Sequence, residues 1–232
     1  MSFDLQQSQA GFIAALRNGD ESAAQAVIAA ARAAGVEPGT IYLKLLASGM
    51  ITIGELWERN ELSVAEEHLA TEITERLIGQ ISPWFSERTP PNEHGRVVMG
   101  CVAGERHALG LRMLADLFRH QGWRVLYLGA DVPHGDWVRL VVRFNADLVA
   151  ISASAERHMP QTQELIRELR AANPQIEVLV GGACFDRDPE LWRRIGATQY
   201  HPDPLTAVTL ASARYATNAA RQAEQSVLTS KQ

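Results

Sequence analysis

The sequence has few of the residues that define several protein classes. Its 232 residues include only 2 cysteines, Cys101 and Cys184, too few for a disulfide framework or for a zinc site made of cysteine alone. No stretch approaches the roughly 18 to 20 apolar residues of a membrane helix. The first residues have neither a basic start nor an apolar signal core, so we expect no export. These absences predict a cytoplasmic protein with reduced thiols and no membrane association.

Positive charge is also scarce. The chain has 22 Lys and Arg against 27 Asp and Glu, a net charge of -5, and no basic tract. Phosphate contacts need clustered Lys and Arg, so direct nucleic-acid binding is not expected. Hydrophobic residues make up 46% of the chain, enough for a core, and the length allows one large domain or two small ones.

Residues 8–88 are rich in Ala, Leu and Glu and predict a bundle of about four short helices. Asp20 is a suitable helix cap, and Pro38 can begin the next helix. We expect Gly49 and Gly54 to interrupt the stretch that follows. A capping box at Ser63 begins another helix, whose inward stripe is predicted as Leu69, Ile73, Leu77 and Ile81.

The pattern changes after a predicted linker over residues 86–95. Strands are predicted at residues 96–102, 123–128, 147–152, 176–180 and 198–200, and helices at 107–121, 137–144, 158–172, near Leu191 and from Pro204. Alternation of this kind predicts an α/β domain over 95–217 with a doubly wound, flavodoxin-like (Rossmann-like) parallel sheet of about five strands. In such sheets ligands bind over the carboxyl ends of the strands.

Ordinary nucleotide and hydrolase motifs are missing from these ends. The glycines after the first strand lack dinucleotide spacing, no Walker lysine follows a glycine-rich loop, and no His-Glu-x-x-His occurs. Ser152 and Ser154 have no evident triad partners in the sequence. We therefore expect no enzyme of these classes.

The first strand is instead followed by Glu105-Arg106-His107-Ala-Leu-Gly110. A carboxylate two residues before a histidine can bind the ring nitrogen that faces away from a ligand, which fixes the tautomer and raises the basicity of the other nitrogen. Gly110 lets a large group approach the following helix. The alternative is a loop histidine beside a surface acid.

The motif, its place after the first strand, and the helical half before it resemble the cobalamin-binding module of methionine synthase, corrinoid shuttle proteins and cobalamin-dependent mutases. That family has Asp-x-His-x-x-Gly, so Glu105 departs from its usual Asp. The resemblance implies that His107 is the lower cobalt ligand and that Arg106 and Gly110 lie beside the cofactor. It also implies a slot for the nucleotide tail, lined by Ser152, Ser154, Gly181 and Gly182.

In the helical half, Trp57 is followed by nine residues and then by Glu67 and His68. This spacing resembles the CarH-type light sensors, in which the bundle caps the upper face of adenosylcobalamin. The resemblance implies that Trp57 packs on the adenosyl group and that Glu67 and His68 line its pocket. The alternative places Trp57 in the bundle core and the Glu-His pair in solvent.

The light-sensor resemblance implies a non-enzymatic homo-oligomer that changes assembly on illumination and signals to a partner protein. No winged-helix DNA-binding domain fits before residue 8. A second histidine after the Trp, present in some members, is replaced by Glu58. In photocobilins, which the chain also resembles, a bilin such as biliverdin is a second pigment. Without an evident attachment cysteine, it would bind here non-covalently.

Three alternatives stay open. A corrinoid shuttle protein of a methyltransferase system has a similar bundle, α/β domain and length, but needs an upper face that opens to a methyl donor. A stand-alone mutase subunit is less compatible with the helical half. An interaction module without a cofactor would leave Glu105 and His107 without a role.

Overall fold

The computed structural model describes the backbone of residues 3–86 and 95–229, and the side chains as far as residue 220. Apart from its two end residues, the predicted linker lies outside the described residues. The chain divides into two compact units, Met1–Arg88 and Thr89–Gln232. Within the described residues, no helix is both long enough and apolar enough to cross a membrane.

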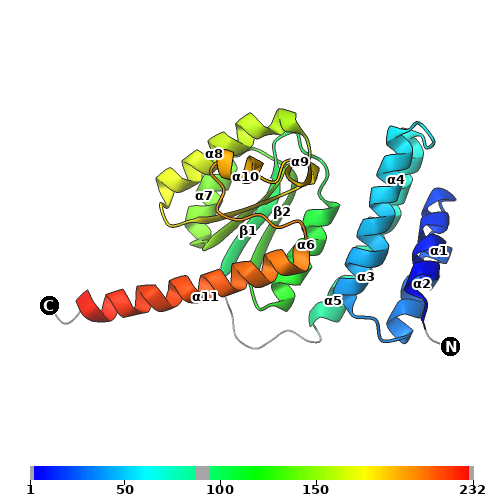
Figure 1. The fold of residues 1–232 in the computed structure, drawn as a ribbon, viewed down its shortest axis with the longest axis horizontal. Coiled ribbons are helices and arrows are strands. Elements are labelled where there is room, and N and C mark those ends of the chain that lie inside the picture. The colour runs from blue at the N-terminus through cyan, green and yellow to red at the C-terminus, as the bar shows by residue number, and fades with distance from the viewer. Residues whose placement is uncertain (1–2, 87–94, 230–232) are drawn as a thin grey trace. The chain divides into compact units, whose positions relative to one another are not determined.

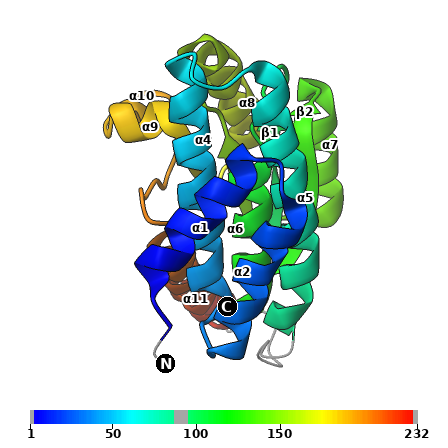
Figure 2. The same ribbon diagram turned by 90° about the vertical axis from the view of Figure 1, so that its right-hand side faces the viewer.

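The first unit is helical, as predicted, and its long helices pack side by side (Figure 2). Asp20 caps the second helix through the backbone N–H of Ala23, and Pro38 occupies the first turn of the third. The elements are α1 (Leu5–Arg17), α2 (Glu21–Ala33), α3 (Pro38–Ile41), a π-helical segment (Tyr42–Ala47), α4 (Ser48–Glu58) and α5 (Val64–Ser86).

The prediction that Gly49 and Gly54 break the chain was wrong, because α4 runs through both. A β-carbon on Gly49 would lie 2.8 Å from the Phe12 ring of α1, whereas one on Gly54 would have no neighbour within 4 Å. Gly49 therefore allows close packing of α1 on α4.

The capping box is confirmed, since the Ser63 backbone N–H donates to Glu66 at 2.7 Å and the Glu66 N–H donates to Ser63 Oγ at 3.3 Å. The predicted stripe is confirmed only in part. Ile73, Leu77 and Ile81 are buried, but Leu69 is exposed.

The second unit contains a sheet flanked by helices (Figure 1). The sheet is parallel, with the strand order β2-β1-β3-β4. The strands are β1 (Arg96–Val102), β2 (Arg124–Val132), β3 (Leu148–Ser152) and β4 (Glu177–Gly181). The fifth strand expected at 198–200 is reduced to a single bridge between Leu179 and Gln199. The register pairs Cys101 with Ser152 and Ser152 with Gly181, so three strands end at one edge.

Helices cover both faces of this sheet, which confirms the doubly wound class. On one face, Trp137 of α7 packs against Gly100 of β1, where a β-carbon would lie 2.9 Å from the ring. On the other, Trp123 lies between Phe118 of α6 and Tyr215 of α11, with ring centroids 5.3 Å apart in both pairs. The helical elements are α6 (Leu109–His120), α7 (His134–Phe144), a short 3-10 turn (Glu156–His158), α8 (Met159–Ala172), α9 (Ala183–Arg187), α10 (Leu191–Arg194) and α11 (Pro204–Thr229).

Candidate functional site

The Glu105 carboxylate is the centre of the predicted motif. It is completely buried just after β1. One oxygen accepts the His107 backbone N–H at 2.9 Å and lies 2.5 Å from His107 Nδ1. The other accepts the Ser154 backbone N–H at 2.6 Å and lies 3.1 Å from His158 Nδ1. Glu105 is therefore a buried acid and not a surface acid.

These contacts fix the charge of Glu105. Burial alone would raise the pKa of its carboxyl, but hydrogen bonds from the His107 side chain and from the backbone of His107 and Ser154 outweigh burial and lower the pKa to about 2. Because the carboxylate has no proton to give, Nδ1 must be the protonated nitrogen of His107. The lone pair of a neutral His107 ring then lies on Nε2, the atom that a metal would take.

The loop before His107 is held from the end of β2. Asp131 Oδ1 accepts the Gly104 backbone N–H at 2.6 Å, and the Asp131 N–H donates to the Glu105 carbonyl at 3.0 Å. The Tyr127 hydroxyl donates to the Ala108 carbonyl at 3.3 Å on the far side of the histidine. The position of His107 is thus set by two neighbouring strands.

The surroundings of His107 fit a bulky metal-bearing cofactor. The His107 side chain is 70% exposed. A β-carbon on Gly110 or on Gly181 would have no neighbour within 4 Å, so both glycines adjoin open space. The described residues include no group of three or more His, Cys, Asp or Glu that could hold a metal. One oriented imidazole suits a metal whose other ligands belong to the cofactor.

The remaining predicted residues of this unit have different surroundings. Ser152 is buried at the end of β3, Arg106 is exposed, and Ser154 contributes its backbone N–H to Glu105. Gly182 has φ +114°, and a β-carbon there would lie 2.5 Å from the Ala153 carbonyl oxygen. Gly182 is therefore required by the packing of two backbone segments, whether or not it also contacts a ligand.

The three predicted residues of the helical unit lie near the end of α4 and in α5. Trp57 is 44% exposed, so it is not a core residue. The Glu67 side chain is 26% exposed, accepts the Thr71 hydroxyl at 3.0 Å and lies 3.7 Å from His68 Nε2. His68 itself is 73% exposed and does not point between helices. An exposed tryptophan on a helical unit is available to cover a ligand.

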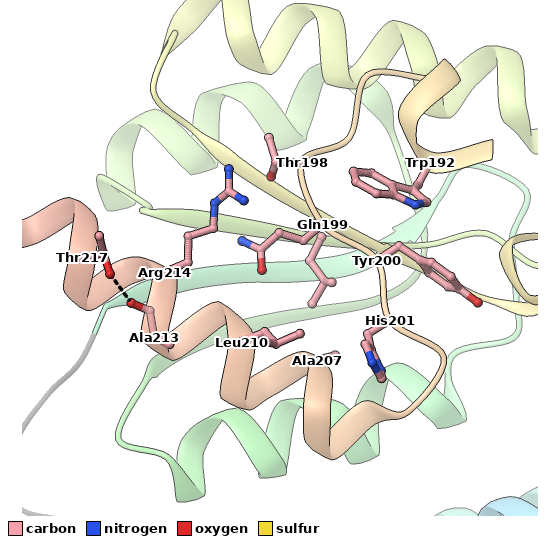
Figure 3. A pocket seen from close by; sticks show the side chains of 11 residues that line it. Trp192, Thr198, Gln199, Tyr200, His201, Ala207, Leu210, Ala213, Arg214 and Thr217 are labelled. Atoms are coloured by element: carbon pink, nitrogen blue, oxygen red, sulfur yellow. Dashed lines mark hydrogen bonds between the residues drawn. The ribbon is translucent and has the colours of Figure 1, made fainter. Parts of the chain in front are cut away.

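A cavity of about 420 Å³ lies between α11 and the segment that follows α10 (Figure 3). Trp192 and Tyr200 lie at one end, and Arg214 and Thr217 at the other. Arg214 forms an ion pair with Glu177 at 2.9 Å. None of the predicted binding residues lines this cavity.

Two residues of the site were missed in the sequence, His158 and Asp131. His158 lies in the 3-10 turn that follows β3, and Asp131 is the penultimate residue of β2, at the edge where a ligand was expected. Their contacts with the Glu105 loop span 53 and 27 residues of sequence, respectively. Sequence position could have nominated them, but only the strand order brings them to Glu105.

An α/β sheet of this order, with an oriented histidine after its first strand, defines a cobalamin-binding type of domain. Comparison with known families supports this class. Two family models, each described as B12 binding domain, match residues 95–209 and residues 9–82. The chain belongs to this cobalamin-binding family, which includes corrinoid proteins.

Individual relatives fall into two groups. The trimethylamine corrinoid protein 1 of Methanosarcina mazei is 30% identical over 190 residues, which cover 80% of this chain and 87% of the relative. The HTH-type transcriptional repressor CarH of Myxococcus xanthus is 33% identical over 153 residues, 65% of this chain, and the chain spans only 50% of that repressor. The solved Methanosarcina barkeri monomethylamine corrinoid protein has a TM-score of 0.80 at 20% identity, covering 90% of this chain and 98% of its own, and it shares the fold.

Proposed function

We propose that this protein is a corrinoid carrier, a non-catalytic subunit that presents cobalamin to a methyltransferase partner. The support is the match along nearly the full length of a methylamine corrinoid protein. The expectation of a light sensor has less support from the comparisons, because the chain matches only half of the CarH repressor.

The observation that carries the proposal is the buried Glu105 carboxylate bonded to His107 Nδ1. This bond would aim Nε2 at the cobalt as its lower ligand. Gly110 and Gly181 would leave room for the corrin ring and for its nucleotide tail, beside Ser152 and Ser154. When bound, the cofactor supplies a cobalt–carbon bond whose alkyl group can pass to a partner enzyme or be released by visible light.

Absorption spectra of the protein with cobalamin test the role of His107. We expect the wild type to show the base-off, histidine-bound form and His107→Ala to lose it. Arg170→Ala is the control, because Arg170 is an exposed residue of α8 and is not among the predicted binding residues. Identical spectra for wild type and His107→Ala would overturn the assignment.

The exposure of Trp57 favours a second candidate, an adenosylcobalamin light sensor that changes its self-association and signals to a partner. The 33% identity with CarH supports it. Trp57 would cover the adenosyl group, and Glu67 and His68 would border it, with His68 the available second cobalt ligand because Glu58 stands after the tryptophan.

A bilin such as biliverdin would have to bind without a thioether link. Cys101 and Cys184 are both buried, and burial raises the pKa of their thiols to about 12 and about 11. Neither thiol is suited to covalent attachment.

The two candidates differ in their response to light. For a light sensor, illumination of the adenosylcobalamin complex changes its elution volume in size-exclusion chromatography. Trp57→Ala then weakens the binding of adenosylcobalamin more than the binding of hydroxocobalamin. Trp84→Ala is the control, because Trp84 belongs to the same unit and stacks on Arg32. For a carrier, elution is the same in light and dark, and the methylcobalamin complex donates its methyl group to an added methyltransferase.

A further inference from the structure

The cavity between α11 and the segment after α10 has no role in the function proposed above. Its volume of about 420 Å³ lies within the range of about 300 to 1,000 Å³ that is typical of small-molecule sites. It follows β4, the last strand of the sheet, through Leu179 and the bridged Gln199. The residues predicted to bind the nucleotide tail of cobalamin do not line it.

Helix α11 separates this cavity from α6. On one flank of α11, Ser212 Oγ accepts the Trp123 indole N–H at 2.8 Å, and Tyr215 packs on the same indole ring, so side chains fill this flank. On the other flank, Leu210 and Arg214 line the cavity (Figure 3). Leu210 is 52% exposed, so a ligand can enter from solvent without crossing the core.

The aromatic end of the cavity is held in place by the protein itself. The Tyr200 hydroxyl donates to Asp186 Oδ1 at 2.7 Å, and the centroid of its ring lies 6.1 Å from that of Phe185. The Arg193 guanidinium covers the Trp192 ring, 4.5 Å from its centroid. Two rings that are already oriented provide an apolar wall for a flat ligand at little cost in side-chain entropy.

Arg214, at the opposite end, is anchored through one nitrogen. Its Nε donates to Glu177 Oε1 at 2.9 Å, and the Asn218 amide donates to the same oxygen at 3.3 Å. In the part of the chain that the structure describes, the two terminal nitrogens of Arg214 form no hydrogen bond. A guanidinium held in this way presents the pair of donors that binds a carboxylate through two parallel hydrogen bonds.

We propose that this cavity binds a small aromatic carboxylate, with its ring against Trp192 and Tyr200 and its carboxylate on Arg214. Among the described residues that line the cavity, Arg214 is a permanent cation and none is acidic, which favours an anion. Glu177 partly neutralises Arg214 without lining the cavity. Long-range attraction is therefore weak, and affinity depends on the directional hydrogen bonds to the carboxylate.

The test is a fluorine NMR titration of the full chain with fluoronaphthoate and with fluoronaphthamide, which has the same shape without the charge. We expect the wild type to bind the acid about tenfold more tightly than the amide. In Arg214→Gln the two dissociation constants should become about equal. Because each protein is titrated with both ligands, this ratio is informative even if Arg214→Gln is less stable. Trp192→Leu should weaken the binding of both ligands, since both place a ring on Trp192.

Arg167→Gln is the matched control, because Arg167 is an arginine of α8 that pairs with Glu164 and does not line the cavity. It should bind the acid as the wild type does. Equal affinity of the wild type for the acid and the amide would overturn the proposal, as would absence of binding or equal losses in Arg214→Gln and Arg167→Gln. The titration is repeated with cobalamin-loaded protein, where we expect the same affinity for the acid. Displacement of fluoronaphthoate by cobalamin would assign the cavity to cobalamin and contradict a separate site.

Discussion

Asp131 Oδ1 and the backbone N–H of Gly104 are 2.6 Å apart and tie the end of β2 to the loop that carries Glu105 and His107. Both residues have left-handed backbones, with φ 53° at Asp131 and 80° at Gly104. Asp and Asn tolerate this conformation better than other side chains do. Asp131 therefore suits the position both by its backbone and by its carboxylate.

We expect Asp131→Ala to reduce cobalamin affinity by about tenfold, because the loop loses a hydrogen bond worth about 1 kcal/mol and Ala is strained at positive φ. Asp131→Asn should keep most of the affinity, because it retains an acceptor and the favoured backbone. Isothermal titration calorimetry with cobalamin measures the affinities of both variants. Equal losses in the two variants would mean that charge at Asp131, rather than loop geometry, controls binding.

Acid stability should depend on Glu105. Its folded-state pKa of about 2 lies below the ordinary value of 4.5, so it stabilises the fold above pH 4.5 and this contribution is lost as pH falls toward 2. We expect the α/β unit to lose about 3 kcal/mol of stability over this range through Glu105. Glu105→Gln should be less stable at pH 7, and its difference from the wild type should shrink on acidification. Urea unfolding at several pH values measures the free energy of unfolding of both proteins. A difference between them that stays constant with pH would contradict the prediction.

Two glycines of α4 provide a matched pair in the helical unit. Gly49→Ala would place a β-carbon 2.8 Å from the Phe12 ring, whereas Gly54→Ala would meet nothing within 4 Å. We expect Gly49→Ala to destabilise the unit by about 1 to 3 kcal/mol through overpacking. Gly54→Ala should stabilise it by about 0.5 to 1 kcal/mol, because alanine is the better helix former. Calorimetric melting of the full chain distinguishes the two variants. Melting temperatures that shift in the same direction in both would be evidence against the packing of Gly49 on Phe12.

The same glycines show which features of the helical unit could be predicted from the sequence and which could not. Periodicity and caps such as Asp20 and Ser63 predicted the helical half, because these signals are local. The role of Gly49 depends on a ring from another helix, so a local rule read it as a breaker. The exposed position of Leu69 likewise depends on which face of α5 its neighbours cover, and spacing alone does not give that.

In the candidate site, the Glu105–His107 pair was predictable because two residues of spacing place the carboxylate within reach of the ring. His158 and Asp131 were not, because they reach Glu105 only after β1, β2 and β3 are assembled in order. The predicted fifth strand at residues 198–200 was wrong because its pairing also depends on contacts between distant segments. Thr198 donates its side-chain and backbone groups to Val178, which leaves a single bridge instead of a ladder.

Gly181 and Gly182 separate ligand binding from folding at the predicted nucleotide-tail slot. A β-carbon on Gly182 would lie 2.5 Å from the Ala153 oxygen on a backbone with φ +114°, so Gly182→Ala should strongly destabilise the α/β unit with or without cobalamin. A β-carbon on Gly181 has no protein neighbour within 4 Å, so Gly181→Ala should leave the melting temperature of the cobalamin-free protein unchanged.

If the tail occupies this space, the methyl group of Gly181→Ala should cost about tenfold in cobalamin affinity through crowding. Cobinamide, which lacks the nucleotide tail, should bind Gly181→Ala and wild type equally, and this comparison is the control. An undiminished affinity of Gly181→Ala for cobalamin would place the tail elsewhere, because no atom of the protein itself competes for the space that the new methyl group fills.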